Sequence, residues 1–270
     1  MTVSDQRRRN VRLPWASIVW SLTAAALFFG SAALQIAASL QRWVTFRASP
    51  QPSVFWAEDH VFDYSFPYDS PPYASQPAIL WEPIGTAAQV FGIGMLIQAL
   101  GVLAMAFGVL ALPGRVARRR MLVEVVLALA VATSFGLTGT HALLSGIAGT
   151  PSPLQHFGLA AEILMVVGLI ALAALWRSRS IAATVACVFL LGSSMLGYLV
   201  ANMAIAPIFA GYGSHDTTPW METVIGASTA LAGLAMLAAI WMVARRGDGT
   251  RTPSPTPSLP SAADVSDQSD

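Results

Sequence analysis

Six apolar segments, each about 20 residues or longer, constrain the fold of this chain more than any other feature of its sequence. An α-helix needs about 20 apolar residues to cross roughly 30 Å of hydrocarbon. Backbone groups in lipid must pair within the protein, and a helix pairs them within one segment. With 55% hydrophobic and 11% charged residues, the chain of 270 residues is too poor in charge for a water-soluble domain. The sequence therefore predicts an all-α bundle of six transmembrane helices, at residues 14–38, 84–112, 121–148, 153–176, 181–206 and 220–244.

The arginines predict how this bundle is oriented. The chain has fifteen arginines and no lysine, and thirteen of the arginines lie on the same side of the predicted helices. Arg42 and Arg47 lie on the other side. Because basic residues near span ends stay in the cytoplasm, we expect a cytoplasmic N-terminus (1–13), a membrane domain (14–246) and a cytoplasmic tail (247–270). The first apolar segment is too long for the core of a signal peptide, so we expect it to stay as an anchor.

The C-terminal tail differs in composition from the spans. Residues 247–270 are rich in Pro, Ser, Thr and Asp and have little to bury, so we expect them to be disordered.

The spans predict a protein that crosses the lipid bilayer several times. We place it in the cytoplasmic (plasma) membrane of a bacterium, with both termini cytoplasmic.

One large loop interrupts the apolar pattern on the predicted extracytoplasmic side, at residues 39–83. It holds ten aromatic residues and seven prolines, a composition that does not form a core alone. Amphipathic rings favour the membrane interface. We therefore expect this loop, together with the shorter connection at 207–220, to lie across the outer mouth of the bundle.

Polar residues inside the apolar segments repeat at helical spacing, and each is costly enough in lipid to require a partner. Residues three or four apart share one face of a helix, so these faces should point into the bundle. Glycines at similar spacing mark the second segment (Gly94, Gly101, Gly108) and the sixth (Gly226, Gly233). The predicted polar interior consists of Ser134, Thr138, Ser145, Gln155, Ser194, Tyr198, Asn202 and Glu222.

His141 and Glu162 are predicted to meet inside this polar interior. Their segments are joined by a short connection, in which Gly149 suits a helix end and Pro153 a helix start. Counted from the tip of this hairpin, His141 lies about 10 Å deep and Glu162 about 13 Å deep. A hydrogen bond from the imidazole to the carboxylate would remove much of the cost of burying each group. Elsewhere, Glu124 is expected to pair with Arg120, four residues before it.

The histidines raise the question of a metal site, because all four lie on or near the predicted outer side with carboxylates close by. Imidazoles and carboxylates suit a divalent transition metal. Their spacing matches no metal-binding or haem-binding motif, so we predict no cofactor. The single Cys187 excludes an intramolecular disulfide and cysteine-rich zinc sites. The outer-face candidates are Asp59, His60, His156, His215 and Asp216.

Three classes of function are compatible with these patterns. The first, which the sequence favours, is a non-catalytic membrane subunit or accessory protein that engages a membrane protein partner. The second is a small permease or proton-coupled carrier that uses the polar interior around His141 and Glu162. The third is an extracytoplasmic protein linked to metal or haem. No segment has an interior proline and no inverted repeat is apparent, so the carrier ranks below the accessory role.

Other chemistry has no support in the sequence. The chain has no glycine-rich phosphate loop ending in Lys, and no GxSxG turn for a serine nucleophile. The arginines flank membrane spans, so we expect no binding to nucleic acid. An enzymatic role is thus less expected than a non-catalytic one.

Overall fold

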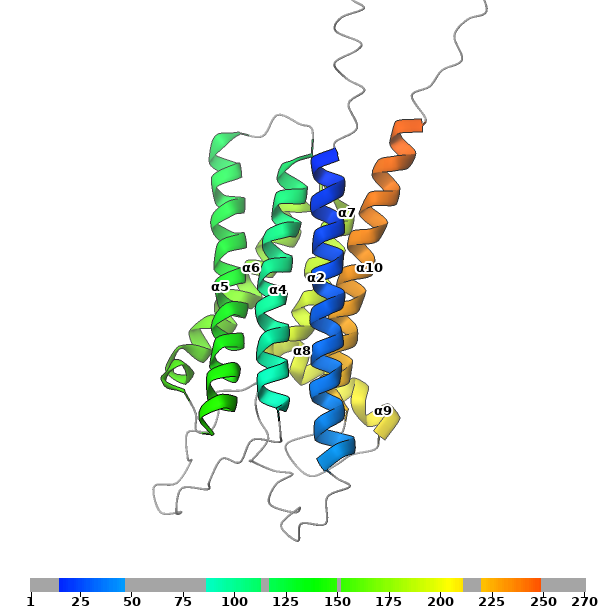
Figure 1. Ribbon diagram of the computed structural model, residues 1–270. Helices are drawn as coiled ribbons and strands as arrows, with labels where there is room; N and C mark the ends of the chain where they lie inside the picture. The colour runs from blue at the N-terminus through cyan, green and yellow to red at the C-terminus, as the bar shows by residue number, and fades with distance from the viewer. Residues whose placement is uncertain (1–14, 47–85, 113–116, 150–151, 211–219, 249–270) are drawn as a thin grey trace, which may run out of the picture.

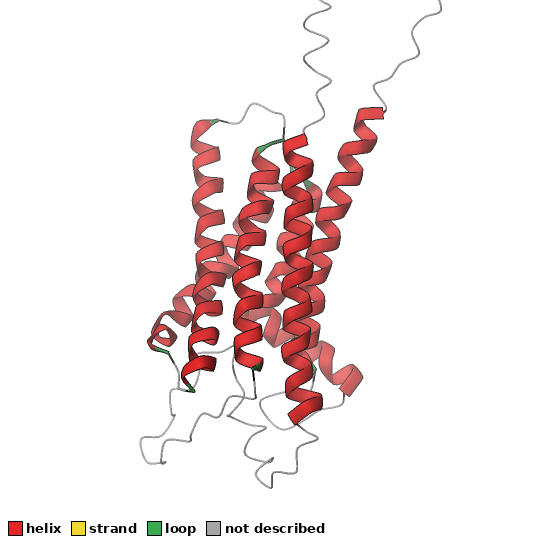
Figure 2. Cartoon of the chain, in the orientation of Figure 1, coloured by secondary structure: helices red, strands yellow, loops and turns green. Residues whose placement is uncertain are grey.

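The computed structural model describes residues 15–46, 86–112, 117–149, 152–210 and 220–248. These residues form a bundle of long helices (Figure 1), and no strand occurs among them (Figure 2). The elements are α2 (Trp15–Leu40), the π-helical η1 (Gln41–Phe46), α4 (Ala87–Leu110), α5 (Arg118–Ala148), the 3-10 helix η2 (Pro153–Phe157), α6 (Gly158–Trp176), α7 (Ile181–Leu190), the 3-10 turn η3 (Leu191–Ser193), α8 (Met195–Val200), the π-helical η4 (Ala201–Ile205), α9 (Ala206–Ala210) and α10 (Met221–Asp248).

Five of the described helical segments are long and apolar enough to cross a membrane. The predicted segment 181–206 differs from them, because the pieces Ile181–Ser193 and Met195–Phe209 are bent by 70° where they meet. Counted as one broken span, this pair gives six spans. The prediction of an all-α protein with helices of membrane-spanning length is confirmed. The prediction of a single helix over 181–206 is corrected, because the structure has two pieces there. The cause of the break between them is described below.

Close approach of backbones explains the glycines on α4 and α10. α4 packs between α2 and α5, and α10 packs against the other side of α2. A Cβ on Gly92 would lie 2.6 Å from the Gly139 carbonyl oxygen of α5, and a Cβ on Gly101 would lie 2.6 Å from the ring of Phe28 on α2. Gly226 and Gly233 of α10 likewise face α2. Small residues let membrane helices pack this closely, so the predicted glycine faces are packing faces.

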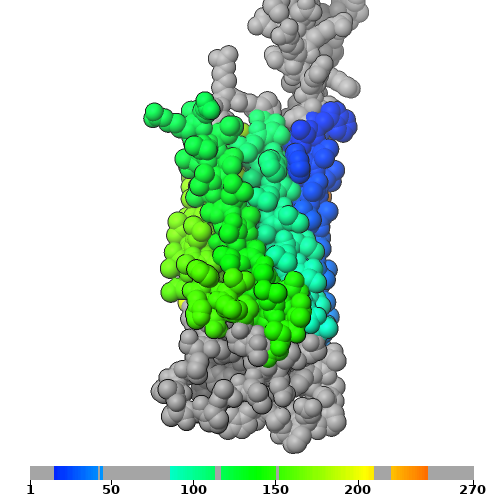
Figure 3. Space-filling view, turned by 60° about the vertical axis from the view of Figure 1, so that its left-hand side comes forward, coloured from blue at the N-terminus to red at the C-terminus, as the bar shows by residue number. Residues whose placement is uncertain are grey.

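The outward faces of the helices are apolar. Figure 3 shows one side of the bundle, where the side chains of α5 and α6 form a continuous wall. Its exposed large side chains include Val126, Leu129, Ile163, Val167 and Ile170. A continuous apolar surface of this kind is costly in water and suits contact with lipid.

The end of the bundle at which α2 begins and α10 ends is held by a buried carboxylate (Figure 1). Glu124 of α5 is 1% exposed and pairs with Arg120 at 3.1 Å and with Arg179 at 2.9 Å. Arg179 also donates to the Val109 carbonyl of α4, and Arg120 donates to the Leu175 carbonyl of α6. The predicted pair of Glu124 with Arg120 is confirmed. Arg179 precedes α7, so the two arginines together link α4, α5, α6 and α7 at this end.

Several predicted features lie outside the described residues. They are the N-terminal residues 1–13, the part of the large loop at 47–83 and the tail from residue 249 onward. Residues 39–46, predicted to begin that loop, instead complete α2 and form η1.

Candidate functional site

The candidate site is built around the break in the segment that follows α6. Ser194 has an extended backbone (φ −103°, ψ 169°) between η3 and α8. Its hydroxyl donates to the Leu191 carbonyl at 2.6 Å, and its backbone N–H donates to the same carbonyl at 3.1 Å, so both groups of Ser194 close the last turn before the break. Gly192 and Ser193 precede it, and Gly–Ser pairs are a recognised cause of sharp helix kinks. These residues explain a break without proline.

Glu162 of α6 lies against this break. Its Oε2 accepts a hydrogen bond from the backbone N–H of Met195, the first residue of α8, at 2.8 Å. The first turn of a helix has N–H groups that need partners from outside the helix, and within lipid depth they must come from the protein. Glu162 is 7% exposed, and no arginine or histidine among the described residues pairs with it. The carboxylate thus meets a backbone dipole instead of a cationic side chain.

Two buried carboxylates line one small cavity at the break. The cavity has a volume of about 20 Å³, enough to hold a water molecule. Glu162 and Glu222 reach it from α6 and α10, and hydroxyl groups reach it from α5 and from the broken span. The structure therefore brings together four residues predicted to form the polar interior. The lining residues are Phe91, Met95, Thr138, Glu162, Ser193, Ser194, Tyr198, Glu222 and Ile225.

Glu222 is fixed by the end of α2. It lies in the first turn of α10, is 3% exposed, and accepts a hydrogen bond from the indole N–H of Trp43 at 2.7 Å. The next residue, Thr223, shares a hydrogen bond with Ser39 at 2.8 Å. No sequence pattern pairs Trp43 with Glu222, because they lie 179 positions apart.

His141 has a different partner from the one predicted. Its Nδ1 is 2.8 Å from the hydroxyl of Ser152, and the Ser152 backbone N–H in turn donates to Ser145 at 2.9 Å. A cavity of about 10 Å³ lies between His141 and Glu162, and Gln155 also lines it. The direct hydrogen bond expected between His141 and Glu162 is not among those that the described residues make.

The connection before α6 explains this difference. Residues Pro153–Phe157 form a 3-10 helix, so α6 begins only at Gly158. A 3-10 helix rises about 2.0 Å per residue instead of 1.5 Å, so the depth count along one continuous helix no longer applies. Ser152 then lies directly beside the imidazole, while Glu162 turns toward the break.

A chain of polar side chains continues from the cavity into the middle of the bundle. Ser193 shares a hydrogen bond with Thr229 at 3.0 Å, and the Thr229 hydroxyl lies 3.4 Å from Gln98 Oε1. Gln98 Oε1 also accepts from Gln35 at 2.7 Å and from Ser31 at 3.2 Å. Gln35 Oε1 and Gln98 Nε2 are buried without a hydrogen-bond partner in the described part of the chain. This amide cluster was missed as a unit, although two glutamines at lipid depth were a signal.

The other predicted residues have separate positions. Ser134 and Thr138 donate to carbonyls of their own helix, at 3.0 Å and 3.1 Å, and neither is exposed. Asn202 is half-buried one helical turn beyond Tyr198. His156 is exposed on η2. Four outer-face candidates lie outside the described residues: Asp59, His60, His215 and Asp216.

A metal centre has no support in the described ranges. Within residues 15–46, 86–112, 117–149, 152–210 and 220–248, no three His, Cys, Asp or Glu residues gather closely enough to hold a metal ion. Cys187 is buried inside α7.

Compared with known protein families, curated proteins and solved structures, the chain shows no significant match.

Proposed function

We propose that the protein is a membrane carrier that binds a proton or a small cation at Glu162 and moves it through the polar interior. The observation that carries this proposal is the broken span, whose second piece begins against the buried Glu162 carboxylate. Non-helical backbone at membrane depth is tolerated where it lines a cavity inside the protein, and broken spans of this kind form the binding sites of many carriers. The lack of an interior proline, one of the two grounds that ranked the carrier below an accessory role, did not prevent a break in the span. The other ground, the lack of an inverted repeat, is unchanged.

The chemistry of the cavity supports a positively charged solute. A carboxylate buried near hydrocarbon without a cationic side chain is costly, and a bound proton or cation removes its charge. Thr138, Ser194 and Tyr198 offer oxygen atoms around the same cavity. Hard cations prefer oxygen ligands.

The polar chain supports a direction of movement. It leads from the cavity through Ser193 and Thr229 to Gln98, in the middle of the bundle. The far end, beyond this chain, is closed by the ion pairs of Glu124. We propose that the solute enters from the end opposite to the chain termini and that the Glu124 end opens at a later step.

The predicted orientation, with both termini in the cytoplasm, is part of the proposal and rests on the split of the arginines. Single-cysteine variants at Ser65 and Ser254, made after Cys187 is replaced by Ala, test it. We expect a membrane-impermeant maleimide to label the Ser65 variant in intact cells. Labelling of Ser254 from outside would reverse the orientation.

Flux measurements in proteoliposomes test the function. Vesicles that contain the purified protein are given a pH gradient or a sodium gradient, and uptake is followed with a pH-sensitive or sodium-sensitive dye. We expect flux in the wild type, a loss of about tenfold or more in Glu162→Gln, and flux retained in Glu162→Asp, which keeps the charge. Equal flux in wild type and Glu162→Gln would contradict the role of Glu162.

An absence of wild-type flux under both gradients would overturn the carrier proposal. The accessory role would then be the better account, with its partner sought by cross-linking in the native membrane. Bound metal in the purified wild type, lost in His60→Ala and His215→Ala, would favour the metal-linked class.

A further inference from the structure

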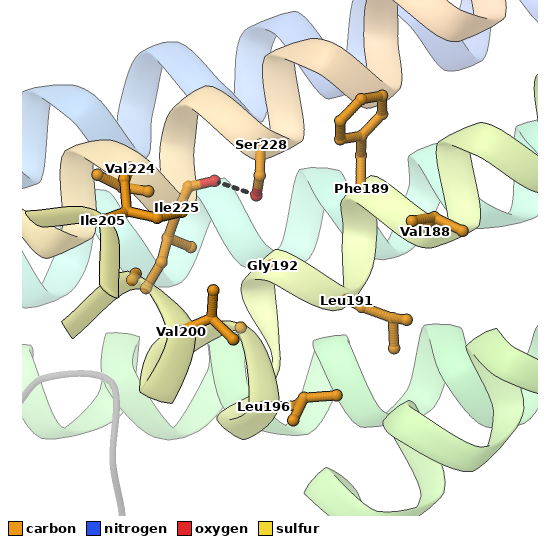
Figure 4. Close-up of a pocket in the computed structure, with 12 residues that line it drawn as sticks. Val188, Phe189, Leu191, Gly192, Leu196, Val200, Ile205, Val224, Ile225 and Ser228 are labelled. Carbon is orange, nitrogen blue, oxygen red and sulfur yellow. Dashed lines mark hydrogen bonds between the residues drawn. The ribbon is translucent and has the colours of Figure 1, made fainter. Parts of the chain in front are cut away.

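An apolar groove lies on the outer surface of the bundle, between the broken span and α10. It has a volume of about 300 Å³. Figure 4 shows Val188 and Phe189 before the break, Leu196 and Val200 after it, and Val224 across the groove on α10. Val188, Leu196 and Val200 are each about half exposed, so the groove is open to the surroundings.

The floor of the groove is closed by small residues. A Cβ on Gly192 would lie 2.2 Å from the Ser228 hydroxyl oxygen, and a Cβ on Gly197 would lie 2.2 Å from the Gly192 Cα. Ala201 continues this floor and is 2% exposed. Because these residues have little or no side chain, the two pieces of the broken span and α10 touch beneath the groove and leave it deep.

The groove offers almost nothing for a polar ligand to bind. Among the described residues, Ser228 is the one polar side chain that lines it, and its hydroxyl donates to the Ile225 carbonyl of its own helix at 2.7 Å (Figure 4). A nucleotide, a sugar or an ion would find no charge and no free hydroxyl here. An occupant must therefore be apolar along its whole length.

The position of the groove limits where that occupant comes from. Val224 and Ser228 lie about 5 to 10 Å along α10 from its first residue, Met221, and hence within the membrane-spanning part of the helix. At that depth, the groove opens onto the apolar girdle of the bundle, which lipid surrounds. An apolar cavity of about 150 Å³ holds a six-carbon ring, so this groove has room for roughly ten carbons of a chain.

We propose that the groove binds one acyl chain of a membrane lipid, and that this chain holds the broken span in its bent form. The two pieces meet at an angle of 70°, and the groove lies over this bend, with residues of both pieces and of α10 lining it. Ile225 lines both the groove and the small cavity beside Glu162, so the acyl chain and the cavity share one wall. Removal of the lipid leaves the wall unsupported on its outer side.

A photoreactive lipid tests this site directly. The wild-type protein is reconstituted into phosphatidylcholine vesicles that contain a small fraction of phosphatidylcholine with a diazirine in the middle of one acyl chain. After illumination, labelled peptides are mapped. Bulk lipid competes for the groove, so we expect groove residues 188–205 and 224–228 to be labelled about threefold more than the lipid-facing residues 163–170 of α6.

Two adjacent residues of α8 supply the variant and its control. Val200 lines the groove and Leu199 does not, although their exposures are similar, at 47% and 40%. Val200→Trp fills the groove and should reduce labelling there to the level of α6, whereas Leu199→Trp should leave it unchanged. Thermal unfolding of both variants verifies that they are folded.

Three results would overturn the proposal. One is labelling of the wild-type groove no stronger than that of α6. Another is an equal reduction in Val200→Trp and Leu199→Trp, because the effect would then not depend on the groove. The third is a groove that cross-links to a second protein chain in place of lipid, which would identify it as a helix-packing surface.

Discussion

Two buried glutamates at opposite ends of the bundle have different surroundings. Glu124 is 1% exposed, and each of its carboxylate oxygens faces an arginine. Glu162 is 7% exposed, accepts one backbone N–H, and lines two small cavities. Glu124 is thus neutralised by the protein itself. In the proposed carrier, a bound proton or cation neutralises Glu162, so the comparison sets a structural carboxylate against a proposed binding one.

The largest expected effect is on stability, at Glu124. Glu124→Gln leaves the guanidinium of Arg179, which is 13% exposed, without its charge partner. Breaking one side of a buried ion pair costs about 3 to 5 kcal/mol of unfolding free energy. Unfolding of the purified protein in mixed micelles, with Glu162→Gln as the matched control, measures the difference. Equal losses in the two variants would remove the distinction between the glutamates.

A smaller loss is expected when Glu162 is replaced by a side chain that cannot accept a hydrogen bond. Glu162→Leu removes the carboxylate acceptor of the Met195 N–H, at a cost of about 1 to 3 kcal/mol. Glu162→Gln keeps an oxygen in that position and should cost less than about 1 kcal/mol. The same unfolding assay compares the two. If Leu is tolerated as well as Gln, the hydrogen bond does not stabilise the break.

The hydroxyl at the break is expected to contribute less again. Ser194→Ala removes the bond to the Leu191 carbonyl, and we expect a loss of about 1 kcal/mol. Ser178→Ala, at the end where Glu124 lies, is the control and should change unfolding less. Stabilisation by Ser194→Ala would mean that the hydroxyl maintains a strained bend.

The smallest effect is expected at the exposed arginine of the Glu124 cluster. The Arg120 side chain is 40% exposed, and ion pairs of that kind contribute about 0 to 1 kcal/mol. Arg120→Gln should therefore be milder than Arg179→Gln in the unfolding assay. The reverse order would show that the half-exposed arginine is the main partner of Glu124.

The sequence predicted the long helices well because their physical signal is strong. Long apolar runs bounded by arginines or glycines predicted five of the spans, and the predicted ends lie within about four residues of the ends of the helices. The glycines at heptad-like spacing correctly marked the faces where α4 and α10 meet α2. Both signals lie within one segment, so they can be recognised without knowing which segments meet in space.

The break could not be predicted from hydropathy, because residues 181–206 are predominantly apolar and include no charged residue. Its local signal is the run Gly192–Ser193–Ser194, which weakens a helix without the clear mark of a proline.

The contacts of the site depend on how segments meet in space. Helical spacing predicted that Glu162, Thr138 and Tyr198 face inward, and the three residues line one cavity. The partner of Glu162 could not be predicted, because it is the backbone N–H of Met195. This N–H needs a partner from outside its helix only because α8 begins there, after the break.

The most direct test of the central claim is to observe the protonation of Glu162 itself. Infrared difference spectra of the protein in lipid, recorded between alkaline and acidic pH, report the C=O stretch of each carboxylic acid that gains a proton. We predict a band that Glu162→Gln removes and that Glu124→Gln leaves in place, with a smaller band when sodium is added if the cation competes for the same carboxylate. Wild-type and Glu162→Gln spectra that are identical would contradict the account, because Glu162 would then exchange neither proton nor cation.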